Sequence, residues 1–275
     1  NLGGGILQIL LSPGSFKSKI IIILLMVLLG GGASLGGLFG NGTSQPYQST
    51  QVTRTNKTHV DDADAQFVSK VLATTEDHWH KVFQAEGRTY QEPKLVFYTG
   101  RTKTGCGVGQ ASAGPFYCPT DKKIYLDMSF YKELTTKYKA SGDFAMAYVI
   151  AHEVGHHVQN ELGILGKYHR MQQGLSEKER NAISVRIELQ ADYLAGVWAR
   201  SIQDRNLLDI GDIEEAMNAA HAVGDDTLQE QAYGYSVPDS FTHGTSEQRM
   251  RWFKRGYQYG DLQHGDTFSL SDSEL

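Results

Sequence analysis

The sequence has few cysteines and no excess of basic residues. Cys106 and Cys118 are the only two among 275 residues, which excludes a disulfide-dense mini-protein and a zinc module with four cysteine ligands. The 26 Lys and Arg residues are outnumbered by 31 Asp and Glu residues, so the net charge is −5. General nucleic-acid-binding proteins usually carry a basic excess, and we therefore expect no nucleic-acid partner. Apolar residues make up 40% of the chain, close to the usage of folded globular proteins.

The first 60 residues differ in composition from the rest. Residues 20–39 carry no charge and begin with the apolar run IIIILLMVLL, and 20 such residues are about the length of a transmembrane helix. Lys17 and Lys19 precede this segment. By the positive-inside rule, we expect a single-pass protein of the cell membrane, with residues 1–19 in the cytoplasm and the rest of the chain outside it.

Two other interpretations of this segment remain open. It also fits the apolar core of a signal peptide that is cleaved near Ala33 or Gly37, or a buried helix of a soluble domain. Beyond it, the polar residues 40–59 predict a linker, and residues 60–260 predict one globular domain. Residues 261–275 contain four acidic and no basic residues, and we expect them to form a flexible tail.

Helical periodicity dominates the predicted domain. The short apolar segments Lys94–Tyr98 and Lys123–Asp127 predict strands on either side of a glycine-rich loop at residues 100–114. Helices are predicted at residues 64–84, 129–138, 144–162, 177–203, 213–222 and 246–257. Ser176 and Glu179 have the spacing of a capping box at the start of the longest helix. The predicted fold class is therefore α+β, mostly helical with a small sheet.

The strongest chemical signal is the sequence His152-Glu153-Val154-Gly155-His156. It continues the apolar segment FAMAYVI, so it lies on a predicted helix, where positions i and i+4 share one face. The two imidazoles can bind one cation, and Zn²⁺ accepts such ligands while keeping a position for water. Glu153 can accept the proton of that water as it attacks a peptide carbonyl.

The third ligand distinguishes the classes of such sites. A three-histidine site would need Gly and His at positions that hold Gln159 and Leu162, so that class is excluded. A later predicted helix offers Glu188 and Asp192, which lie four positions apart on one face. Glu188 would complete the site, and Asp192 would accept a hydrogen bond from the far nitrogen of a ligand histidine. Alternatively, both acids are solvated and pair with arginines such as Arg186.

Four stretches of the chain resemble the bacterial putative neutral zinc metallopeptidase family, whose members carry a single N-terminal membrane segment. These stretches are residues 114–127, 142–159, 187–198 and 241–256. The helix with Glu188 and Asp192 also resembles that of the glutamate-liganded zincin peptidases, which implies a zincin-like domain. The resemblance implies one Zn²⁺ bound by His152, His156 and Glu188, with Glu153 as the general base. It implies no particular substrate.

Three residues near the motifs are weaker candidates. His243 lies in a loop before the last predicted helix, where it could stabilise the oxyanion of the scissile carbonyl; helix capping or exposure to solvent is the alternative. Arg249, one turn into that helix, could instead bind acidic groups near the site. His157 points away from the two ligand histidines, and we expect it to support the site without binding metal.

The two cysteines flank the glycine-rich loop. In an oxidising compartment, Cys106 and Cys118 are expected to form a disulfide that closes a loop of about 13 residues, and two reduced thiols are the alternative. The bridge would hold the strand Lys123–Asp127 near the motif helix. We expect this strand to offer its edge to an extended peptide.

These residues predict a membrane-anchored zinc endopeptidase that acts on a protein or peptide substrate. Glu153 favours an enzyme, because a purely structural zinc site needs no base beside its water. Two alternatives remain open. One is a zinc-stabilised binding or assembly module outside the cytoplasm, without turnover. The other is a peptidase kept latent by residues 100–114 or by a partner over the cleft.

Overall fold

The computed structural model describes residues 62–127, 129–136, 140 and 142–275. The predicted cytoplasmic segment, transmembrane segment and linker, residues 1–59, lie outside the described residues. Among the helices of the described part, none has both the length and the apolar composition that crossing a membrane requires.

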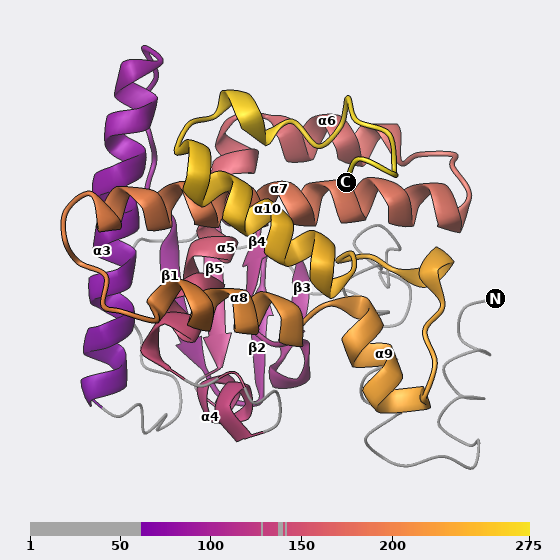
Figure 1. Cartoon of the computed structure of the whole chain (residues 1–275), viewed down its shortest axis with the longest axis horizontal. Coiled ribbons are helices and arrows are strands. Elements are labelled where there is room, and N and C mark those ends of the chain that lie inside the picture. The colour runs from indigo at the N-terminus through magenta and orange to yellow at the C-terminus, as the bar shows by residue number, and fades with distance from the viewer. Residues whose placement is uncertain (1–61, 128, 137–139, 141) are drawn as a thin grey trace, which may run out of the picture.

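The described chain is mostly helical with a small sheet, as predicted (Figure 1). The helices are α3 (Asp62–Ala85), α4 (Ser129–Thr136), α5 (Asp143–Glu161), α6 (Ile164–Met171), α7 (Glu177–Gln203), α8 (Asp212–Ala222), α9 (Asp225–Tyr233) and α10 (Ser246–Tyr259). The strands are β1 (Lys94–Tyr98), β2 (Arg101–Thr104), β3 (Gly107–Gln110), β4 (Phe116–Cys118) and β5 (Lys123–Asp127). Short 3-10 helices lie at Ala111–Ala113, Pro238–Ser240 and Gln263–Gly265. The predicted capping box of α7 is present, with Ser176 and Glu179 satisfying each other's backbone N–H groups.

The three-stranded sheet has the order β1-β5-β4, so β5 is its middle strand. β5 runs parallel to β1 and antiparallel to β4, with Tyr117 opposite Ile124. Both edges of β5 are therefore paired, and the prediction that Lys123–Asp127 offers an edge to a substrate is wrong. The edge strands of this sheet are β1 and β4. The predicted loop at residues 100–114 contains a second, two-stranded sheet, the antiparallel hairpin β2–β3.

Helix α5 lies in the centre of the fold and is buried along almost its whole length. Gly155, the glycine of the histidine motif, lets α7 approach it closely. A Cβ at position 155 would lie 2.9 Å from the carbonyl oxygen of Ala191, which is closer than real Cβ atoms come. Gly196 and Gly256 do the same where α7 meets α10, because a Cβ on either would overlap the backbone of the other helix. These close approaches bring side chains of α5, α7 and α10 within bonding distance of one another.

Residues 261–275 do not form the flexible tail that their charge predicts. Leu275 is 3% exposed, and its carbonyl oxygen accepts a hydrogen bond from the Trp252 indole of α10 (3.1 Å). Arg186 of α7 donates to the carbonyl oxygen of Leu270 (2.8 Å). The arginine that was an alternative partner for the acids of α7 thus binds the C-terminal segment instead. The folded domain extends to the last residue because α7 and α10 supply groups that composition alone does not reveal.

Candidate metal centre

Helices α5 and α7 bring the three predicted metal ligands together. His152 and His156 lie one turn apart on α5, and Glu188 faces them from α7. The Nε2 atom of His152 lies 3.1 Å from Oε2 of Glu188, and Nε2 of His156 lies 3.4 Å from Oε1. One ligand atom from each residue lies within 4.8 Å of the others, so the three could hold one ion.

These distances fit a tetrahedral zinc ion. With metal–ligand bonds of about 2.0–2.2 Å, neighbouring ligand atoms of a tetrahedron lie roughly 3.3–3.6 Å apart. The distance from Nε2 of His156 to Oε1 of Glu188, 3.4 Å, lies within that range, and the distance from Nε2 of His152 to Oε2, 3.1 Å, lies just below it. Two imidazoles and one carboxylate are also a donor set of zinc sites that keep a position for water. The residues therefore fit one Zn²⁺.

The ligands carry complementary charges in the metal-free protein. Burial raises the pKa of Glu188, but the charge of His156 and the hydrogen bond from His152 outweigh it and hold this pKa well below its usual value. Burial lowers the pKa of His152, but Asp192 and Glu188 raise it to about 10. A zinc ion must therefore displace a proton from His152 when it binds.

Asp192 orients His152, because its carboxylate accepts a hydrogen bond from Nδ1 (2.8 Å) and leaves Nε2 for a metal. Asp192 is fully buried and also accepts from the hydroxyl of Tyr148 (2.6 Å). Arg249 of α10 donates to both carboxylate oxygens, over 2.8 and 3.0 Å. Burial raises the pKa of Asp192, but Arg249 and His152 lower it to about 2. Arg249 thus binds an acidic group near the site, as one prediction had it, and that group is the carboxylate of Asp192.

Gln159 orients the second ligand histidine and was not identified from the sequence. Its amide oxygen accepts a hydrogen bond from Nδ1 of His156 (2.9 Å), which leaves Nε2 of that ring for the metal. Its amide nitrogen donates to the carbonyl oxygen of Ile187 (2.8 Å), so the same side chain ties α5 to α7. Gln159 lies three positions after His156 on the same helix face, a spacing that could have indicated this contact.

Glu153, the predicted general base, lines the same pocket as the ligands and is 7% exposed. Burial raises its pKa more than the charges of His152 and His156 lower it, and the backbone N–H of Tyr117 donates to its carboxylate. A carboxylate with a raised pKa accepts a proton at neutral pH more readily than an exposed one.

His243 also lines this pocket, and Asp225 at the start of α9 holds it there. The fully buried Asp225 carboxylate accepts from the backbone N–H groups of Thr242 (2.6 Å) and His243 (2.7 Å), and from Nδ1 of His243 (3.1 Å). Nδ1 therefore carries the proton, and Nε2 is left for the pocket. Burial lowers the pKa of His243, but Asp225 raises it further, so the net shift is upward. No local spacing in the sequence indicates this pair, because the two residues lie in different elements.

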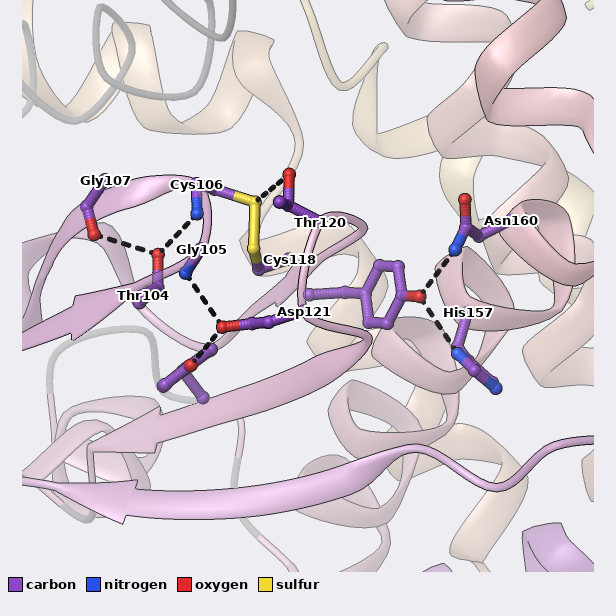
Figure 2. The surroundings of a disulfide bond; sticks show 11 residues. Thr104, Gly105, Cys106, Gly107, Cys118, Thr120, Asp121, His157 and Asn160 are labelled. Carbon is purple, nitrogen blue, oxygen red and sulfur yellow. Dashed lines mark hydrogen bonds between the residues drawn. A yellow bond between two sulfur atoms is a disulfide. The ribbon is translucent and has the colours of Figure 1, made fainter. Parts of the chain in front are cut away.

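The pocket has a volume of about 300 Å³, and residues 111–117 form one of its walls. The same residues lie within the loop that the Cys106–Cys118 disulfide closes, which confirms the predicted bridge (Figure 2). Cys106 sits at the tip of the β2–β3 hairpin, and Cys118 ends β4. The segment that contains this wall is thus closed covalently.

His157 supports the wall and faces away from the ligands, as predicted. Its Nδ1 accepts a hydrogen bond from the hydroxyl of Tyr117 (3.0 Å), and its Nε2 donates to the carbonyl oxygen of Gln91. Asn160 donates to the same hydroxyl (3.0 Å; Figure 2). Burial lowers the pKa of His157, which favours the neutral ring that these partners require. The contacts fix the edge strand β4 against α5.

Comparisons with known proteins agree with this geometry. A family model described as "Putative neutral zinc metallopeptidase" matches residues 1–268. The chain is 55% identical over 240 residues to the uncharacterized protein YpfJ of Escherichia coli strain K12, which covers 87% of this chain and 82% of that protein. It is 44% identical over 194 residues to the uncharacterized protein Rv2575 of Mycobacterium tuberculosis strain H37Rv, covering 66% of this chain and 64% of that protein. No solved structure matches the chain significantly.

Proposed function

Because the chain belongs to the putative neutral zinc metallopeptidase family, we propose that it is a zinc-dependent endopeptidase with a zincin-like domain. The observation that carries this proposal is the convergence of two imidazoles and the Glu188 carboxylate at a pocket that also contains Glu153. A zinc ion that only stabilised the fold would need neither an open pocket nor a buried acid beside it.

The residues of the pocket have separate roles in peptide hydrolysis. His152, His156 and Glu188 would hold the Zn²⁺, which would supply a water of lowered pKa and polarise the scissile carbonyl. Glu153 accepts the proton of the attacking water and passes it to the leaving amine. The Nε2 atom of the protonated His243 ring donates a hydrogen bond to the carbonyl oxygen as this oxygen gains negative charge, while Asp225 accepts from Nδ1 and favours the protonated ring.

An extended protein or peptide substrate binds along β4 in this proposal. This strand pairs with β5 on one side, and two of its residues, Phe116 and Tyr117, line the pocket. Backbone hydrogen bonds along a strand edge bind a peptide without regard to its sequence, which suits an endopeptidase.

We further propose that the domain lies outside the cytoplasm, anchored to the cell membrane by residues 20–39. The Cys106–Cys118 disulfide supports this placement, because disulfides persist mainly in oxidising compartments.

The substitution Glu153→Gln tests the proposed chemistry. It should abolish hydrolysis of a mixed peptide pool, measured by mass spectrometry, while the protein still binds one zinc per chain. Glu161→Gln is a matched control, because Glu161 ends the same helix and pairs with Lys122 (2.8 Å). Wild-type activity should be lost with a chelator and restored by Zn²⁺. If the zinc-loaded wild type cleaves no peptide, or if Glu153→Gln stays active, the proposal fails, and the first result favours a zinc-stabilised binding module.

A further inference from the structure

One face of helix α5 carries the proposed general base and two further polar side chains. Glu153, His157 and Asn160 lie at positions i, i+4 and i+7, which share a helix face. Strand β4 contacts this face through Tyr117. The backbone N–H of Tyr117 donates to the Glu153 carboxylate, and its hydroxyl contacts both His157 and Asn160 (Figure 2). Tyr117 therefore meets α5 at two points, and one of them is the base.

The backbone contact with Glu153 lies on the side of β4 that faces away from β5. Tyr117 is opposite Ile124 of β5 in the antiparallel pair. The N–H and C=O groups of one residue in such a strand point to the same side, so an N–H that reaches Glu153 is not shared with β5. The hydrogen bonds of the sheet therefore leave the approach of this N–H to α5 to be set by other contacts.

The hydroxyl of Tyr117 supplies such a contact, because it both donates and accepts a hydrogen bond. His157 donates from Nε2 to the carbonyl oxygen of Gln91, so its neutral ring accepts at Nδ1 from the hydroxyl (3.0 Å). The side-chain amide of Asn160 donates to the hydroxyl oxygen (3.0 Å). His157 is fully buried, and Lys122 donates to the side chain of Gln91 (3.1 Å), so this acceptor is held as well. The far end of the Tyr117 side chain is thus fixed on α5.

We propose that Tyr117 is a positioning residue of the peptidase, whose hydroxyl, held on α5, keeps its backbone N–H at the Glu153 carboxylate and so aims this base at the attacking water. The inference rests on the proposed peptidase function and adds a residue to it. The N–H group fixes one carboxylate oxygen and leaves the other for the proton. A general base must lie within hydrogen-bond reach of the proton that it accepts, and a displacement of about 1 Å can cost about 100-fold in rate.

The substitution Tyr117→Phe removes the hydroxyl and keeps the ring and the backbone. In the zinc-loaded full chain, kcat should fall about 10–100-fold, while KM and the zinc affinity stay within about twofold of wild type. This split is expected because the residues that line the pocket do not include His157 or Asn160, the partners of the hydroxyl. A purely structural role would lower stability and leave kcat of the folded protein unchanged. Tyr125→Phe is the matched control, because it removes the same atom from β5, and it should leave kcat unchanged.

A second variant keeps Tyr117 in place, so the result does not depend on one substitution. Asn160→Leu has nearly the same shape but cannot donate to the hydroxyl. It should lower kcat in the same direction and add little to the loss in Tyr117→Phe, because both act through one contact. Exchange of the Tyr117 amide hydrogen, followed by NMR in protein with isotope-labelled tyrosine, should be at least about tenfold faster in Asn160→Leu than in wild type.

The kinetic and exchange measurements separate this inference from the proposed chemistry. Faster exchange in Asn160→Leu without any cleavage by the wild type keeps the positioning of Glu153 by Tyr117 and refutes the peptidase. Cleavage by the wild type with kcat unchanged in Tyr117→Phe and Asn160→Leu overturns the inference and keeps the peptidase. A loss confined to KM or to zinc affinity also overturns it, as does an equal loss of kcat in Tyr125→Phe.

Discussion

Two of the residues that contact the buried carboxylate of Asp192 respond differently to its removal. It accepts the Nδ1 hydrogen of His152, and it is the counterion of Arg249, which is 4% exposed. The substitution Asp192→Asn keeps the shape of the side chain but removes its charge. The arginine then remains buried without a counterion, and the histidine loses the partner that makes it a stronger ligand.

The two effects have different magnitudes. Removing one partner of a buried ion pair costs about 3–5 kcal/mol, which lowers the melting temperature of a domain of this size by about 6–20 °C. Loss of the carboxylate behind a ligand histidine weakens metal binding by about 10–100-fold. Urea unfolding of protein from which a chelator has removed the metal measures the loss of stability. Competition with a chromophoric chelator measures the zinc affinity.

A second substitution separates stability from metal binding. Arg249→Met added to Asp192→Asn removes the unpaired charge, so the double variant should regain most of the stability but not the zinc affinity. Asp204→Asn is the control, because Asp204 makes an exposed ion pair with Arg200 at the end of the same helix region (3.2 Å). It should change stability by less than about 0.5 kcal/mol. A stability of Asp192→Asn within about 1 kcal/mol of wild type, or wild-type zinc affinity in the double variant, would refute this reasoning.

Three further predictions concern pH, the oxyanion and the disulfide. Because the pKa of His152 is raised from 6.5 to about 10, protonated His152 stabilises the folded protein without zinc fully at pH values below 6.5. This stabilisation is lost as the pH rises from 6.5 to about 10. Apparent zinc affinity should therefore rise by about tenfold per pH unit in that window, and a flat profile in chelator competition would contradict the proton displacement. His243→Gln should lower kcat about 100- to 1,000-fold with zinc content unchanged, and Asp225→Asn should add little to it in the double variant; additive losses in steady-state kinetics would disprove the coupling. Replacing Cys106 and Cys118 by serine should cost about 3 kcal/mol in urea unfolding, and equal stability would show that the loop needs no bridge.

Local patterns predicted part of the fold. The bounds of β1, β5 and α7 agree with the prediction, because two strands are compact apolar segments and the helix begins with a capping box. The hairpin β2–β3 escaped prediction because its strands, RTKT and GVGQ, lack an apolar alternation. The short helices α6 and α9 were also missed. Such short helices form because they pack against neighbours that are distant in the sequence.

In the candidate site, too, local spacing predicted some relations between residues and missed those that depend on tertiary packing. His152 and His156 could be predicted to face one ion because a helix alone sets their relation. Glu188 could be chosen by its residue type and by the resemblance, but its distance to the histidines depends on how closely α5 and α7 pack at Gly155. The pairing of Asp225 with His243 depends on how α9 meets the loop before α10, and no spacing in the sequence expresses that.

The docked C-terminal segment affects when the site can mature. Glu188 lies between Arg186 and Gln190, and both of these side chains hold carbonyl oxygens of residues 265–270. The helix that carries the third ligand thus depends for part of its support on residues about 80 positions further along the chain. During synthesis, both histidines emerge well before residues 265–270 can bind to α7. We therefore expect tight metal loading to require that residues 265–270 have been synthesised and have docked on α7.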